Sequence, residues 1–149
     1  MRVALDTNVL ARADGVNGAT MKNQAVEILA KLSVQTVFVP AQVLAELFNL
    51  LVRKDKQTPA YARETILRWR GQFPVMETSG DVIASAVDLA ERHRLSIWDS
   101  IVLSSAAEAG CALLISEDLQ DGFEWRGVTV ANPFGRAKNE LLRRALGER

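Results

Sequence analysis

Four acidic residues stand at positions where an α/β protein could use carboxylates for chemistry, and they are called the four acids below: Asp6, Glu46, Asp99 and Asp118. Asp6 directly follows the apolar run of residues 3–5, and Asp118 follows the apolar run of residues 112–115. Open α/β sheets place their ligand sites just beyond the carboxyl ends of such strands. Asp99 lies in the first turn of an expected helix, where unpaired N–H groups and the helix dipole favour an anion.

The fourth acid, Glu46, lies in an expected helix that is apolar around most of its circumference, residues 41–54. Val43 and Leu50 share its face, and an isolated buried carboxylate is costly without a partner. We therefore expect Glu46 either to face a polar cleft or to pair with an arginine.

Strand patterns and helix patterns alternate along the chain, which predicts a single α/β domain with a central parallel sheet and helices on both faces. Strands are expected at residues 3–5, 36–39, 75–77, 112–115 and 128–130. Val9 and Leu10 continue the apolar pattern after the first of these strands. Residues 122–127 are expected to be a variable connection flanked by glycines. A strand that begins as early as residue 3 is expected to be central.

The expected helices follow cap signals and apolar stripes. Thr20 is expected to cap the helix that ends at Leu32. Thr58, which is followed by a proline, is expected to cap the helix of residues 59–69. Ser79 opens a helix that ends near residue 93, with an inner stripe formed by Ile83, Ala86, Val87 and Ala90. The helix that carries Asp99 is followed by Gly110 as its C′ residue.

If the strands at residues 3 and 112 are parallel neighbours, the four acids converge on one edge of the sheet. Two unit charges about 5 Å apart at an effective dielectric near 20 repel by roughly 3 kcal/mol, so the cluster requires cations or raised pKa values. Hard oxygen ligands without a Cys or His pair suit Mg²⁺ or Mn²⁺ better than zinc. Divalent ions held by carboxylates recur in phosphodiester hydrolysis.

Composition is typical of one soluble domain: 149 residues, 48% hydrophobic, with 18 basic and 18 acidic side chains. The zero formal charge gives no overall field that would attract a polyanion. The single Cys111 lies in an apolar strand and fits a structural thiol in a reducing compartment. Neither a signal peptide nor an apolar run long enough for a membrane span is present, so we expect a cytoplasmic protein.

Several segments together carry a family resemblance: LDTNVL at the start, PAQVLAELFNLL, SIWDSIVLSSAAEAGCALLISEDLQDG, and VANPF near the end. They resemble the PIN-domain family, in particular the VapC-type ribonuclease toxins of prokaryotic toxin–antitoxin pairs. The match runs over residues 1–134 as one PIN-like nuclease domain. Residues 135–149 lie outside it and form a charged tail, expected to be a short helix with Leu141, Leu142 and Leu146 on one side.

The resemblance implies that the four acids are the catalytic, metal-binding residues, with Asn8 and Ser116 as polar supports of the site. It implies endoribonuclease activity that depends on Mg²⁺ or Mn²⁺, an RNA substrate, a homodimer, and inhibition by a small antitoxin encoded beside it.

Weaker expectations concern the surface. Arg12, Arg53, Lys54 and Lys56 are candidates for contacts to RNA phosphates. The three tryptophans are expected to be core or interface residues rather than base-stacking platforms. The apolar helices of residues 41–52 and 59–69 are expected to form the dimer, unless the tail covers them.

Other classes of protein remain open from the sequence. A metal-dependent phosphatase or a DNA nuclease could use the same acids, and an assay of RNA, DNA and phosphomonoesters side by side separates these activities. A non-catalytic α/β interaction module with vestigial acids is the third alternative, although the presence of all four acids argues against decay.

Overall fold

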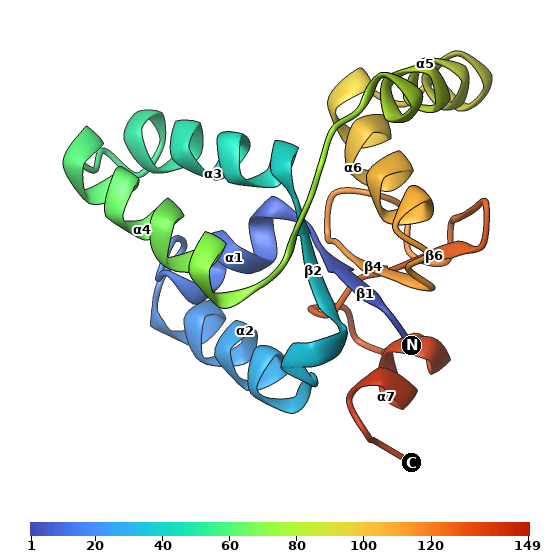
Figure 1. The fold of residues 1–149 in the computed structure, drawn as a ribbon. Coiled ribbons are helices and arrows are strands. Elements are labelled where there is room, and N and C mark those ends of the chain that lie inside the picture. Colours follow the sequence, from blue (N-terminus) through green and yellow to red (C-terminus); the bar gives the residue numbers. More distant parts are fainter.

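A six-stranded sheet forms the centre of the molecule, with the strand order β3-β2-β1-β4-β6-β5 (Figure 1). The computed structural model describes all residues from 1 to 149. The strands are β1 (Val3–Leu5), β2 (Val37–Pro40), β3 (Val75–Met76), β4 (Leu113–Ile115), β5 (Glu124–Trp125) and β6 (Val128–Ala131). All neighbours pair in parallel except β5 and β6, which are antiparallel. The predicted parallel sheet, with β1 at its centre beside β4, is confirmed.

Helices cover both faces of this sheet, as predicted. They are α1 (Thr7–Ala13), α2 (Ala19–Lys31), α3 (Ala41–Arg53), α4 (Pro59–Gln72), α5 (Gly80–His93), α6 (Ile97–Glu108) and α7 (Glu140–Ala145), with a 3-10 turn at Val34–Thr36. Figure 1 shows α1 to α4 on one side of the strands and the α5–α6 pair on the other. All residues of β1, β4 and β6 are buried, because parallel strands need cover on both faces.

The first strand has its predicted bounds, Val3–Leu5, and the apolar residues Val9 and Leu10 that follow it lie in α1, a helix that was not predicted from the sequence. Asp6 is the N-cap of α1, and its Oδ1 accepts a hydrogen bond from the backbone N–H of Thr7 at 2.7 Å. Val9 and Leu10 are fully buried on this helix. A short apolar run is consistent with a buried helix as well as with a strand. Here the Asp6 cap favours the helix.

The inner face of α5 also differs from the predicted stripe. Val82, Ala86 and Leu89 are buried, whereas Ile83 and Val87 are 37% and 54% exposed. The Ser79 cap was predicted correctly, since its Oγ accepts from the N–H of Val82. The predicted stripe is shifted by about one residue toward the C-terminus from the buried one. Both sets of residues are apolar and have helical spacing, so the sequence pattern alone fits either face.

Two other expectations need correction. Gly18, not Thr20, occupies the N-cap position of α2, so that helix starts without a side-chain cap. The glycine-flanked connection before β6 contains β5, which forms a hairpin with β6 through Arg126 and Gly127. Both turn residues have positive φ, 47° and 84°, as a two-residue turn that matches the sheet twist requires.

The C-terminal segment packs against the sheet. α7 lies near the N-terminus in Figure 1 and contacts β4 and β6. Leu142 and Leu146 are buried in the main core, and Glu148 pairs with Lys31 and Lys138. The tail therefore covers part of the sheet and leaves the outer faces of α3 and α4 open. No helix combines the length and apolar character needed to cross a bilayer.

Candidate active site at the carboxyl edge of the sheet

Asp6 occupies the centre of the carboxyl edge. Its backbone N–H donates to the carbonyl of Ile115 at 3.0 Å, which continues the pairing of β1 with β4 and brings Ser116 alongside. Ser116 Oγ donates to Asp6 Oδ2 at 2.6 Å. The Asp6 residue is only 3% exposed, and this burial raises the pKa of its carboxyl to about 7. The hydrogen bonds from Ser116 and Thr7 oppose the rise, and the charges of Asp118 and Glu46 add to it.

Asp118 lies in the loop after β4 and is held by both predicted supporting residues. Its backbone N–H donates to Ser116 Oγ at 3.2 Å, and its Oδ2 accepts from Asn8 Nδ2 at 2.5 Å. Partial burial raises the pKa of the Asp118 carboxyl, and the nearby charges of Asp99, Glu117 and Glu46 add to the rise. The hydrogen bond from Asn8 acts in the opposite direction.

Glu46 meets this edge from α3. Its Oε2 accepts from Thr7 Oγ1 at 2.7 Å, and its Oε1 accepts from Gln42 Nε2 at 3.3 Å. Glu46 was expected either to face a polar cleft or to pair with an arginine. It lines two polar hollows and forms no salt bridge, so the first expectation is confirmed. Thr7 thus connects Glu46 to the segment that carries Asp6.

Asp99 lies in the first turn of α6, as predicted. Its backbone N–H donates to the Oγ of the N-cap residue Ser96 at 3.1 Å. The Asp99 side chain is half-buried, and its charge contributes to the raised pKa of Asp118. The four acids therefore lie at one edge of the sheet: Asp6 between β1 and α1, Glu46 on α3, Asp99 on α6 and Asp118 in the loop after β4.

No Lys, Arg or His side chain pairs with any of the four acids, because every salt bridge of the chain lies elsewhere. No group of three or more His, Cys, Asp or Glu side chains comes close enough to hold a metal ion directly. The donor chemistry nevertheless fits Mg²⁺, which prefers oxygen ligands and commonly keeps several waters while binding one or two carboxylates. We conclude that the edge concentrates negative charge without providing a protein counter-charge.

Arg12 takes a place that the sequence did not indicate. Its Nε and Nη2 donate to the two carboxylate oxygens of Glu117 at 2.8 and 2.5 Å, and its guanidinium lies over the ring of Phe134 at 4.5 Å. Arg12 and Glu117 are 105 positions apart, so no local pattern connects them. The arginine that was a candidate for RNA phosphates is thus enclosed in a contact beside Asp118.

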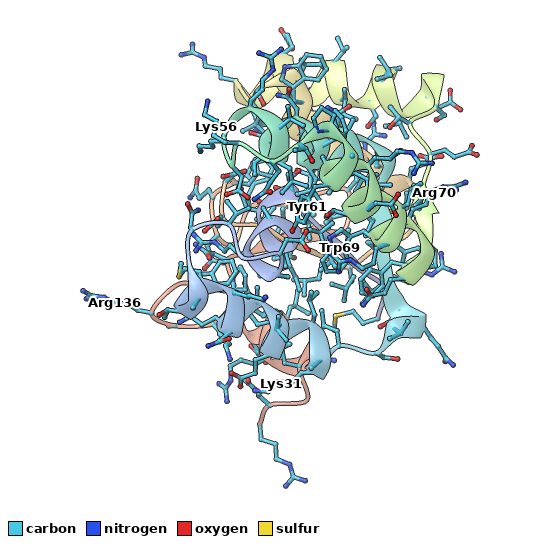
Figure 2. The ribbon with its side chains drawn as sticks, turned by 90° about the vertical axis from the view of Figure 1, so that its left-hand side faces the viewer. Lys31, Lys56, Tyr61, Trp69, Arg70 and Arg136 are labelled. Carbon is cyan, nitrogen blue, oxygen red and sulfur yellow. The ribbon has the colours of Figure 1, made fainter.

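The other three candidate RNA contacts, Arg53, Lys54 and Lys56, are exposed at the end of α3 and after it. None of the three takes part in a salt bridge, although Arg53 Nε donates to Asn49 Oδ1 at 3.0 Å. Figure 2 shows Lys56 at the outer edge of the molecule.

The family model of the PIN domain matches residues 3–123, so the chain belongs to the PIN-domain family. This result agrees with the family to which the segment motifs were compared. No curated protein sequence gives a significant match.

Several solved structures share the fold at low sequence identity. VapC20 of Mycobacterium tuberculosis, described as a toxin that cleaves the sarcin–ricin loop, is 19% identical with a TM-score of 0.64 over 75% of this chain and 86% of that one. A toxin–antitoxin complex from Klebsiella pneumoniae contains a chain that is 21% identical, with a TM-score of 0.65; the match covers 89% of this chain and 98% of that one. VapBC2 from Rickettsia felis, bound to promoter DNA, is 16% identical with a TM-score of 0.63, and the match covers 87% of this chain and 97% of that one.

Proposed function

We propose that this protein is a metal-dependent endoribonuclease that hydrolyses RNA phosphodiester bonds, and that it is the toxin of a toxin–antitoxin pair. The observation that supports this best is the convergence of four carboxylates on one edge with no protein cation among them. Membership of the PIN-domain family and the fold shared with toxins support the same function.

In this proposal the four acids would hold Mg²⁺ or Mn²⁺ at the sheet edge, one or two of them as direct ligands and the others through waters that the ion keeps. A bound ion would supply positive charge for the phosphodiester oxygens and acidify a water nucleophile. Ser116 and Thr7 fix the Asp6 carboxylate from its two sides, and Asn8 orients Asp118. Asp118 is exposed and Asp99 is half-buried, and we propose that one of these two takes a proton from the attacking water.

The activity test compares the native chain with folded Asp6→Ala, Glu46→Ala, Asp99→Ala and Asp118→Ala variants on RNA, DNA and a phosphomonoester. We expect cleavage of RNA with Mg²⁺ or Mn²⁺, its loss in EDTA, and its loss in each variant. Glu91→Gln, an exposed acid on α5 outside any salt bridge, is the control that should cleave normally. RNA cleavage that persists in folded Asp99→Ala would contradict metal-dependent hydrolysis by these residues. Cleavage of DNA instead of RNA would indicate a DNA nuclease, and cleavage of the phosphomonoester would indicate a phosphatase.

A binding test does not depend on turnover. Because the acids repel one another, millimolar Mg²⁺ or Mn²⁺ should raise the melting temperature of the native chain by a few degrees. Asp6→Asn and Asp99→Asn should each remove most of this gain. An unchanged melting temperature of the native chain across the titration would count against a metal site here.

The proposal includes two protein partners. A small cognate antitoxin would keep the toxin inactive in the cytoplasm, as the solved toxin–antitoxin complexes with this fold suggest. The second partner is another copy of the chain in a homodimer. Co-expression with the protein encoded beside it, followed by co-purification and a growth assay, tests the antitoxin.

A further inference from the structure

An exposed tryptophan borders the acidic edge. Trp98, next to Asp99 in α6, is 58% exposed, more than any other large hydrophobic side chain of the chain. It lines a hollow of about 310 Å³ together with four residues of α3, which are Gln42, Ala45, Glu46 and Asn49. Trp98 was expected from the sequence to be a core or interface residue; the core part of that expectation is wrong, because more than half of Trp98 is exposed.

A second hollow of about 390 Å³ continues along α3 and is lined by Glu46, Asn49, Leu50, Arg53 and Lys54. Glu46 and Asn49 line both hollows, so the two form one surface path, called the α3 groove below. From Ala45 to Arg53 the helix rises by about 12 Å, at 1.5 Å per residue. The groove therefore has an aromatic end, a carboxylate of the acidic edge in its middle and a cationic end.

The cationic end is free to bind a ligand. Arg53 and Lys54 are exposed and have no carboxylate partner, and the neighbouring Asp55 accepts from Gln57 instead. An aromatic face binds a nucleobase of any sequence by stacking, and exposed Arg and Lys bind backbone phosphates. A protein partner could pack on Trp98, but it would also need acidic residues to pair with Arg53 and Lys54, whereas RNA provides both bases and phosphates.

We infer that the α3 groove binds single-stranded RNA, with a base stacked on Trp98 and a backbone phosphate at Arg53 and Lys54. The phosphodiester between these two contacts then passes over Glu46, beside the other acids. This inference rests on the proposed function and adds to it the path of the RNA, from Trp98 along α3 to Arg53 and Lys54.

The first experiment measures binding of fluorescent single-stranded oligouridylate and oligoadenylate to the full chain carrying Asp118→Asn, which prevents cleavage. In this background Trp98→Ala should weaken binding about 5- to 150-fold, the range expected when one base can no longer stack on an aromatic ring. Trp98→Phe should restore most of the affinity. Val87→Ala, which truncates a similarly exposed apolar residue on α5, should leave the affinity unchanged.

The second experiment tests the cationic end. Arg53→Gln with Lys54→Gln should weaken binding and reduce the slope of log K against log salt by about 0.7 for each phosphate that is no longer neutralised. Lys22→Gln on α2 is the control for loss of an exposed lysine, because Lys22 is also exposed and lies outside the groove. A double-stranded RNA of the same sequence should bind more weakly, since its bases are already stacked on one another.

The outcomes separate this inference from the proposed function. Unchanged RNA affinity in Trp98→Ala would overturn the groove, whether or not the native chain cleaves RNA. If Trp98→Ala converts a dimer to a monomer in sedimentation and leaves RNA affinity unchanged, Trp98 is an interface residue and the groove is also wrong. Absence of cleavage by a native chain that binds RNA through Trp98 would instead contradict the ribonuclease activity alone.

Discussion

At the scale of single residues, the contact of Arg12 with Glu117 and Phe134 fixes the loop that carries Asp118. The side chains of Arg12 and Glu117 are 13% and 19% exposed, so their charges are poorly solvated. Removing one partner of such a pair leaves the other charge without compensation.

Arg12→Gln should therefore lower the free energy of unfolding by about 1–3 kcal/mol and reduce RNA cleavage, because the Asp118 loop loses its anchor. Arg12→Lys should restore little, since an ammonium group cannot make the bidentate contact. Urea unfolding and cleavage rates measure both effects. The control is Arg63→Gln in the exposed pair with Glu64, expected within about 0.5 kcal/mol; an equally small loss for Arg12→Gln would show that its contact is dispensable.

The buried Asp6 carboxyl predicts a pH dependence of stability. Its pKa is about 7 in the folded chain and near 3.9 in an unfolded one, so the folded state binds the proton more tightly. The contribution to stability is greatest at low pH, falls as the pH rises from about 4 to 7, and is constant above that range.

Asp6→Asn has no proton to lose, so its free energy of unfolding should increase relative to that of the native chain as the pH rises through this window. Urea unfolding of both proteins in EDTA between about pH 4.5 and 8 measures the difference. A difference that does not change with pH would show that Asp6 titrates at an ordinary value when folded.

Individual site residues differed in how well the sequence predicted them. The positions of Asp6 and Asp118 were predicted because each follows an apolar strand, and both lie at the shared edge of the sheet. Thr7 was missed although it stands beside Asp6, because only the packing of α3 against α1 brings Glu46 to its hydroxyl. Contacts between distant positions, such as Arg12 with Glu117, have no local sequence signal.

At the scale of elements, α5 shows how a helix face is decided. Val82 and Ala86 pack with Ile101 of α6, whereas Ile83 and Val87 face outward. A single helix sequence with apolar residues on both sides does not reveal which side meets its neighbour.

Val82→Ala should therefore lower the free energy of unfolding by about 1–3 kcal/mol, through reduced burial and a cavity. Val87→Ala removes the same atoms from an exposed position and should change it by less than about 0.5 kcal/mol. Thermal or urea unfolding of the two variants compares them directly. Equal losses, or a larger loss for Val87→Ala, would mean that α5 packs in the register predicted from the sequence.

The same limit explains the other element-level differences. Strand–helix alternation was enough to predict the parallel sheet, because parallel neighbours need helical crossovers. It did not predict that the chain turns into α1 directly after Leu5, or that β5 pairs with β6, since both depend on one or two turn residues.

At the scale of the whole molecule, most of the apolar surface assigned to a dimer is buried within one chain. Leu44, Leu47 and Leu51 of α3 and Trp69 of α4 belong to the core. Because α7 packs on the sheet, the tail does not cover what remains on the outer faces of these helices. The remaining exposed residues are Phe48 on α3 with Tyr61 and Leu67 on α4, and Figure 2 shows Tyr61 on the side of the molecule that faces the viewer.

The proposed homodimer would bury this remaining apolar surface against a second copy. The full chain should sediment as a dimer at micromolar concentration, and Phe48→Lys with Tyr61→Lys should shift it toward the monomer by placing charges in the contact. Val26→Lys adds one such charge at an exposed apolar position of α2 and should leave the dimer intact. Truncation at Phe134 is not a clean test, because removing Leu142 and Leu146 opens the core. A native chain that sediments as a monomer at these concentrations would rule out the dimer and leave the α3–α4 surface free for the antitoxin.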